Sequence, residues 1–345
     1  MANPHDERND QGFNNIRNSS MDKREKKSTL RSYTFLGIIL LTAVLVVTLL
    51  VTAIGAIIAN VASKNDSGSN SAPKGDIKWA EITVSDADTK AGPLVLVNKT
   101  HEYTFPATDD HLASINDKRM THTPRLYLQS GLSTYMERTA LDALDEMLVD
   151  FYAATGKDNV LLKYAYRDYE SQKSFSTAPG FSDHHTGFGI ELAYQLDDRQ
   201  YALSADPTYA WLTENCCKYG FVIRYPDAKA DITGVEDYES YFRYVGVAHA
   251  TYMTANNLCM EEYIELLQTQ KNPLKVTGAD GCKYEIYYFA VDGDTKVEVP
   301  TNYAYTISGT NDGGVVVTVN RSKAPAPTTT ETETSAAVTE TGDEA

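Results

Sequence analysis

Cysteine, tryptophan and net positive charge are all scarce in this sequence. Its 345 residues include four cysteines and two tryptophans, and the formal net charge is -16. The cysteines form no CxxC pair and no Cys/His spacing typical of a zinc knuckle. Phosphate backbones need clustered lysine and arginine, so this acidic composition excludes nucleic acid as a predicted partner.

Charge of either sign is absent from Ser32 to Ser63. A helix crosses a bilayer with about 20 apolar residues, whereas a cleavable signal peptide has an apolar region of only about 7–15. Residues 33–62 therefore predict an uncleaved transmembrane anchor. The basic residues just before this run are Lys23, Arg24, Lys26, Lys27 and Arg31. Because positive charge favours the cytoplasmic side, we expect a single-pass protein of the plasma membrane with a cytoplasmic N-terminus and an extracellular main domain.

Composition divides the chain into six segments. They are a basic cytoplasmic tail (1–32), the anchor (33–62), a Ser/Gly/Asn-rich linker (63–76), a main domain that begins with a hairpin (77–270), a small all-β unit (271–322) and a Pro/Thr/Glu-rich tail expected to be disordered (323–345). In an oxidising compartment, a disulfide that uses Cys259 and free buried thiols are both open.

Helical and strand patterns alternate along the main domain. Apolar residues on one face predict a helix over 135–156: Leu141, Leu144, Leu148 and Phe151. Further elements are predicted as helices at 206–220 and 248–268 and as strands at 160–167, 220–226 and 242–245. In the β unit, GADG and NDGG turns separate alternating apolar runs, which is typical of hairpins.

The side chains that could bind a metal or a substrate are concentrated in residues 164–172, 182–192 and 232–250. The middle segment, SDHHTGFGIEL, holds a histidine pair and an acidic residue seven positions after His184. Imidazole and carboxylate are ordinary zinc ligands, and the intervening glycines let the loop fold back. A lone histidine pair is more often structural, so metal binding and a structural role both stay open on this segment alone.

Several short motifs in order resemble the VanY-type family of zinc D,D-carboxypeptidases over residues 110–265. The family has a Gly-Tyr-Arg-Ser element, then Ser-x-His-x-x-Gly-x-Ala-x-Asp, and later Tyr-Gly-Phe, Arg-Tyr-Pro, Thr-Gly and Glu-x-Trp-His-x-Arg-Tyr-Val-Gly. The matching motifs here are Tyr166-Arg167, Ser182-x-His184-x-Thr186-Gly187, Tyr219-Gly220-Phe221, Arg224-Tyr225-Pro226, Thr233-Gly234 and Arg243-Tyr244-Val245-Gly246. The resemblance implies an α+β fold with a small antiparallel sheet packed with helices.

The resemblance also implies a zinc site and a general base. His184 matches the first zinc ligand, Glu191 the aspartate ligand and Tyr241 the last histidine ligand. Tyr238 stands where the family has its glutamate base, because the stretch from Thr233 to Arg243 aligns without gaps. In the family, the metal lowers the pKa of a bound water and the base takes its proton.

On the substrate side, the resemblance assigns Arg167, Gln172 and Ser182 to binding. The implied ligand is the D-Ala-D-Ala end of a peptidoglycan stem peptide. Arginine binds a carboxylate through two parallel hydrogen bonds and needs no metal for this.

Tyrosine at positions 238 and 241 conflicts with hydrolysis. A phenol has a pKa of about 10, so a neutral one is a poor zinc ligand and cannot accept a proton near pH 7. Glu236 or Glu239 could replace the lost carboxylate only through a shift of the chain. Three hypotheses follow: a pseudo-peptidase that binds without cutting, a working zinc carboxypeptidase with altered ligands, and an envelope interaction module in which the motifs serve only the fold.

Overall fold

The computed structural model describes residues 75–131, 134–236 and 238–325. The predicted basic tail and anchor, nearly all of the linker and most of the C-terminal tail lie outside these residues. Over the described ranges, no helix combines the length and the apolar character that a membrane crossing requires.

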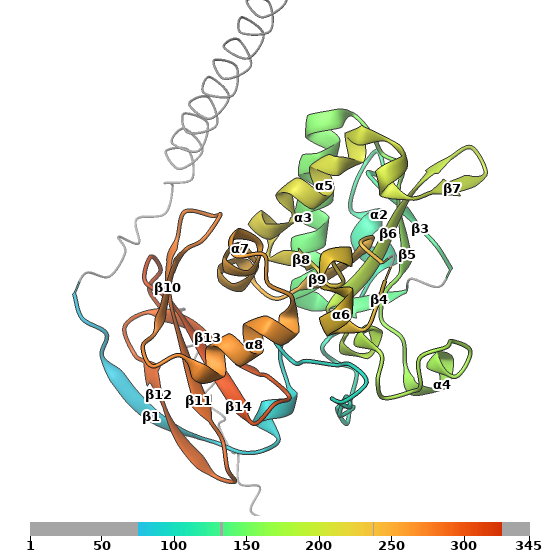
Figure 1. The fold of residues 1–345 in the computed structure, drawn as a ribbon. Helices are drawn as coiled ribbons and strands as arrows, with labels where there is room; N and C mark the ends of the chain where they lie inside the picture. Colours follow the sequence, from blue (N-terminus) through green and yellow to red (C-terminus); the bar gives the residue numbers. More distant parts are fainter. Residues whose placement is uncertain (1–74, 132–133, 237, 326–345) are drawn as a thin grey trace, which may run out of the picture. The chain divides into compact units, whose positions relative to one another are not determined.

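A mixed sheet of six strands forms the centre of the main domain (Figure 1). Its strands are β3 (Leu128–Gln129), β5 (Val160–Tyr164), β6 (Gly189–Leu196), β9 (Tyr241–Tyr244) and β8 (Phe221–Ile223), in that order, with β7 (Arg199–Tyr201) paired to β6. Strands β3 and β5 are parallel and the other neighbours are antiparallel. The α+β architecture agrees with the expectation from the sequence.

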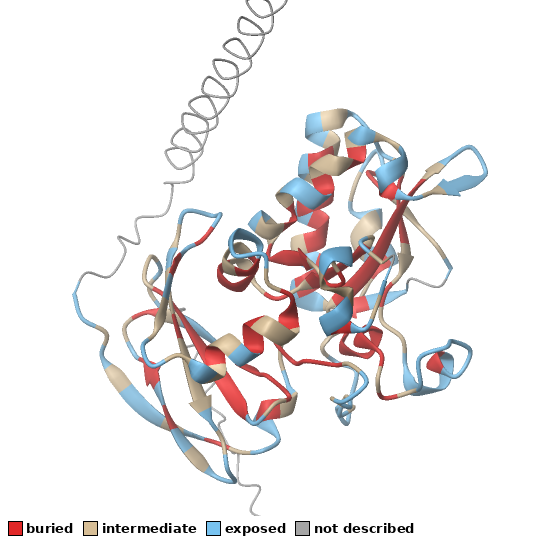
Figure 2. Cartoon of the chain, viewed as in Figure 1, coloured by how far each residue is buried: buried red, intermediate tan, exposed pale blue. Residues whose placement is uncertain are grey.

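Helix α3 (Arg138–Thr155) packs its apolar face on this sheet. The four apolar residues predicted to share a face are all buried in the main core, and the buried positions follow the helix as a stripe in Figure 2. Gly156 ends the helix with a φ of 68°, a conformation that favours glycine. The helix begins three residues later than predicted because β4 (Tyr135–Glu137) pairs with β2 (Leu112–Ser114). The short helix α2 (Ile115–Met120) lies between these two strands in sequence.

Two of the predicted helices are divided in the structure. The 206–220 segment contains α5 (Ala210–Asn215) flanked by 3-10 turns, and it ends at Gly220. The 248–268 segment forms α7 (Val247–Ala255) and α8 (Met260–Thr269). Asn257 separates α7 from α8 with a φ of 51°, which asparagine tolerates better than most residues.

The C-terminal sheet consists of β10 (Leu274–Thr277), β11 (Lys283–Ala290), β14 (Gly314–Asn320) and β13 (Ala304–Gly309), all antiparallel neighbours in that order. The two predicted hairpin turns connect β10 to β11 and β13 to β14, as expected. The hairpin predicted at the start of the main domain does not form. Instead, β1 (Trp79–Val84) pairs with β12 (Thr295–Pro300), and the Trp79 ring packs edge-on against Tyr287, 5.1 Å between ring centroids.

Helices α7 and α8 lie between the two sheets (Figure 1) and share one apolar cluster with both of them. A charged imidazole would be costly inside this layer, and His249 is neutral there because burial lowers its pKa to about 3. Its ring bonds to the Tyr263 hydroxyl at 2.7 Å and to the Thr318 hydroxyl at 2.9 Å. His249 is therefore a packing residue. All four cysteines are free thiols, so no disulfide links α8 to its neighbours.

Candidate functional site

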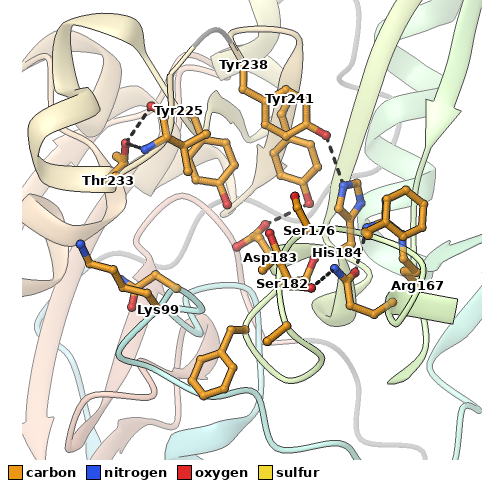
Figure 3. Close-up of a pocket in the computed structure, with 18 of the residues that line it drawn as sticks. Lys99, Arg167, Ser176, Ser182, Asp183, His184, Tyr225, Thr233, Tyr238 and Tyr241 are labelled. Carbon is orange, nitrogen blue, oxygen red and sulfur yellow. Dashed lines mark hydrogen bonds between the residues drawn. The ribbon is translucent and has the colours of Figure 1, made fainter. Parts of the chain in front are cut away.

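The three predicted segments line one cavity of about 810 Å³ (Figure 3). The first supplies Arg167 and Gln172, the second Ser182 and His184, and the third Tyr238 and Tyr241. Strand β6 contributes Glu191 from the cavity wall. The sequence-predicted site residues therefore come together in space.

The Tyr238 hydroxyl lies between the two retained ligand positions. It is 2.8 Å from Glu191 Oε2 and 3.3 Å from His184 Nε2. On its other side, the His184 ring places Nδ1 2.7 Å from the Ala165 carbonyl oxygen, which can only accept, so Nδ1 carries the proton. Burial and the nearby Arg167 guanidinium lower the pKa of His184 to about 3, which keeps the ring neutral and leaves Nε2 as an acceptor.

Glu191 is held by a second donor, Lys163. The Lys163 ammonium lies 2.6 Å from Glu191 Oε1, while the Tyr238 hydroxyl donates to Oε2. Both carboxylate oxygens are thus engaged, and the ammonium compensates their charge. Sequence reasoning did not identify Lys163. It lies where the register of β5 against β6 shifts, and strand alternation alone does not predict such an irregularity.

Tyr241 has a different partner from the one its predicted role requires. Its hydroxyl donates to Asp183 Oδ2 at 3.1 Å, and its ring packs edge-on against His184 with centroids 4.7 Å apart. Burial alone would raise the pKa of Asp183, but Arg243 and Arg224 outweigh burial and hold that pKa below its ordinary value. Burial and the Asp183 charge raise the pKa of Tyr241, so the phenol stays protonated.

Gly189 makes room for the Tyr241 phenol. A Cβ built on Gly189 would lie 1.9 Å from the Tyr241 hydroxyl oxygen, far inside van der Waals contact. In the family pattern this position is alanine and the position of Tyr241 is histidine. Glycine at position 189 and tyrosine at position 241 are therefore sterically matched. The Tyr241 ring is packed in the core.

Arg167 presents its guanidinium to the cavity. Its Nη1 donates to Gln172 Oε1 at 2.8 Å, and the guanidinium carbon lies 3.5 Å from the centroid of the Phe175 ring. Gln172 is buried and donates to the Thr177 carbonyl at 2.7 Å, which fixes the acceptor that orients Arg167. Among the described residues, no carboxylate lies within ion-pair distance of Arg167. Burial lowers the pKa of Arg167.

His185, the second histidine of the pair, supports the backbone behind the cavity. Its Nε2 accepts from the Gly180 N–H at 3.0 Å, and its Nδ1 lies 2.5 Å from the Arg167 carbonyl oxygen. Both ring nitrogens are thereby used, so His185 has no nitrogen left for a metal or a ligand.

The side chains at the predicted metal centre do not fit a zinc ion. A catalytic zinc site takes three protein ligands and keeps one open position. Over residues 75–131, 134–236 and 238–325, no group of three or more His, Cys, Asp and Glu side chains is arranged to hold a metal. His184 and Glu191 are the two ordinary ligands, and a phenol whose pKa is raised by burial and by Glu191 lies between them.

Neither alternative carboxylate completes the set. Glu239 accepts from the Asp227 N–H at 3.3 Å and lines a separate cavity with Ser240. Glu236 lines the main cavity but belongs to the exposed loop before Tyr238. The hypothesis that a shift of the chain brings Glu239 to the site is therefore wrong, because its side chain is used elsewhere.

Comparison with known proteins places these features in a family. A family model described as VanY, D-alanyl-D-alanine carboxypeptidase, matches residues 169–247. A D-alanyl-D-alanine carboxypeptidase of Enterococcus faecium is 30% identical over 249 residues, which cover 69% of this chain and 78% of that protein. The bifunctional D-Ala-D-Ala dipeptidase and D-Ala-D-Ala carboxypeptidase VanXYC of Enterococcus gallinarum is 31% identical over 186 residues, 50% of this chain and 94% of that protein.

The fold agrees with this relationship. The crystal structure of the vancomycin-resistance D,D-dipeptidase VanXYg, in complex with a D-Ala-D-Ala phosphinate analogue, superposes with a TM-score of 0.60 at 24% identity. The match covers 70% of this chain and 99% of that one. This chain belongs to the VanY-type D-alanyl-D-alanine carboxypeptidase family.

Proposed function

We propose that this protein binds the C-terminal end of a D-Ala-D-Ala-type peptide, such as a peptidoglycan stem, without hydrolysing it. One observation carries the proposal: the Tyr238 hydroxyl lies between His184 and Glu191 and donates to Glu191, where the family's metal chemistry would be needed, while Arg167 keeps a guanidinium free of carboxylate partners among the described residues. The groups needed for hydrolysis are missing, whereas the arginine that can bind a carboxylate is retained.

Recognition rests on the orientation of Arg167. One of its N–H groups is bonded to Gln172, and its flat face is stacked on Phe175, so the remaining N–H groups are directed by contacts already made. A pre-oriented guanidinium loses little freedom when it binds a carboxylate through two hydrogen bonds. Ser182, at the cavity wall, offers a further hydroxyl to the ligand.

Loss of hydrolysis follows from protonation states. Burial and the Glu191 charge raise the pKa of Tyr238, so its phenol is neutral at pH 7 and cannot take a proton from water. A positioned general base contributes about 10²–10⁴ in rate. Glu191 is bonded to Lys163 and Tyr238, and His184 has a pKa of about 3, which makes it too weak a base to take a proton from water near pH 7.

Binding and turnover can be measured on the purified full-length protein. Calorimetry with an N-acetylated tripeptide ending in D-Ala-D-Ala should give binding, and Arg167→Ala should weaken it by about tenfold or more, since an arginine–carboxylate bond is worth about 1.5–3 kcal/mol. Arg199→Ala, on the exposed strand β7, is the matched control and should change nothing.

Metal content and product release separate the alternatives. Stoichiometric zinc together with release of D-Ala from the tripeptide would refute the proposal and support a working carboxypeptidase with altered ligands. If there is neither zinc nor peptide binding, and Arg167→Ala has no effect, the motifs serve only the fold of an envelope interaction module.

For location, we propose that residues 33–62 anchor the protein in the plasma membrane with the peptide-binding domain outside the cell. The absence of charge from Ser32 to Ser63 and the five basic residues before it support this orientation. Protease treatment of intact cells should remove an epitope tag placed after the final residue. A tag that stays protected until the cells are lysed would contradict the orientation.

A further inference from the structure

A strap formed by residues 93–101 makes one wall of the cavity. Leu94 through Val97 are buried, and their backbone is held by the two buried arginines of the main domain. Arg243 donates to the carbonyl oxygens of Pro93 and Val95, both at 3.0 Å, and Arg224 lies 3.5 Å from that of Val97. The strap lies outside the segment that the family model matches, yet it is fixed by arginines of the family motifs.

The strap ends in a tight turn with Lys99 at its tip. The His101 N–H donates to the Asn98 carbonyl at 3.1 Å, and the Asn98 side chain accepts from the Thr100 N–H at 3.0 Å. Lys99 thereby lines the cavity, and its ammonium lies 3.6 Å from where a Cβ of Gly234 would stand. Figure 3 shows Lys99 and Arg167 on opposite sides of the cavity.

The C-terminal sheet holds this strap in place through Asn311. The buried Asn311 side chain donates to the carbonyl oxygens of Leu96 and Glu102, at 2.8 and 2.9 Å. It also accepts from Lys90 at 2.6 Å. Asn311 lies in the turn between β13 and β14, so the appended β unit contributes to the cavity wall by positioning the strap.

Charge in the cavity is unevenly compensated. Asp183 is bonded to Arg243, and Glu191 is bonded to Lys163. In the part of the chain that the structure describes, neither Lys99 nor Arg167 has a carboxylate partner. Glu236 also lines the cavity but forms no ion pair with either cation among the described residues. Two cations on opposite walls, in a protein of net charge -16, are suited to a ligand with two separated anionic groups.

We infer that Lys99 determines specificity by contacting a second carboxylate of the ligand, on the residue that precedes the D-Ala-D-Ala pair. This inference rests on the proposed function, in which Arg167 binds the terminal carboxylate. Two residues span about 7 Å, so the residue that precedes the pair lies about that far from Arg167, and Lys99 lies on the opposite side of the cavity. The ligand class is thus a peptide whose side chain at that position carries a carboxylate.

Two tripeptides that differ by one carboxylate test the inference. N-acetyl-L-lysyl-D-Ala-D-Ala and its meso-diaminopimelyl counterpart both carry a side-chain ammonium, so any contact with Glu236 is common to both. The full-length protein should bind the diaminopimelyl peptide about fivefold more tightly at low salt, a preference of about 1 kcal/mol. The preference should shrink as ionic strength rises.

Substitutions assign the preference to Lys99. Lys99→Met should abolish the preference between the two peptides, whereas Lys275→Met, on the exposed face of β10, should preserve it. If the wild type binds both peptides equally, or if Lys99→Met keeps the preference, the inference is overturned and the proposed function stands. If neither peptide binds, both are overturned.

Discussion

The pairing of Gly189 with Tyr241 can be tested by a double-mutant cycle. Gly189→Ala places a methyl group 1.9 Å from the Tyr241 hydroxyl oxygen and 2.4 Å from the ring carbon that bears it, so the buried ring must move. Overpacking of this kind costs about 1–3 kcal/mol. In the absence of the clash, replacing a strand glycine with alanine gains about 0.5–1 kcal/mol. The two numbers together predict a coupling of about 1.5–4 kcal/mol.

The cycle is measured by urea denaturation of four proteins: wild type, Gly189→Ala, Tyr241→Leu and the double variant. Leucine lacks the three atoms that a new Cβ would meet, so Gly189→Ala should destabilise the wild type and slightly stabilise the Tyr241→Leu protein. Gly131→Ala, with open space around the added carbon, is the control for the glycine effect itself. Additive free energies of unfolding in the cycle would refute the steric pairing.

Three further predictions concern protonation, metal binding and the strap. Because His184 and His249 keep pKa values of about 3 in the fold but titrate near 6.5 when unfolded, the free energy of unfolding should be constant above pH 6.5 and fall as the pH decreases below it. At pH 5 each of these two histidines accounts for a loss of about 2 kcal/mol, and burial also lowers the pKa of His185. His249→Gln should therefore reduce the slope in urea titrations without abolishing it, and a flat wild-type profile would contradict the assignments. Tyr238→Glu combined with Tyr241→His should raise zinc affinity in metal analysis after dialysis, and a double variant that retains no metal would show that these positions are not the family's base and ligand. Asn311→Ala should leave the Leu96 and Glu102 carbonyl groups without this donor, cost about 1–3 kcal/mol, and speed hydrogen exchange in residues 94–102. Unchanged exchange there would show that the C-terminal sheet does not hold the strap in place.

Local sequence patterns were sufficient to predict the elements that depend only on neighbouring residues. Helix α3 follows from the spacing of its apolar residues and from Gly156, because side-chain period and a left-handed cap are properties of neighbouring residues. The motif order likewise identified the family and the residues that line the cavity, since each motif is short and its spacing is preserved. The turns of the two C-terminal hairpins were readable for the same reason.

Long-range contacts decided the rest. The pairing of β1 with β12 joins residues more than two hundred positions apart, and the alternation within β1 does not specify its partner. The roles of the two tyrosines also depended on the fold: Tyr238 and Tyr241 matched the base and a ligand position, but Tyr238 lies beside His184 and donates to Glu191 while Tyr241 donates to Asp183. The sequence alone identified the family, its motifs and the two positions, 238 and 241, that depart from the family pattern. Three features follow only from packing: which hydroxyl lies between His184 and Glu191, the bond from Lys163 to Glu191, and the position of Lys99 across the cavity from Arg167. Strand register and loop paths bring these side chains together from distant parts of the chain.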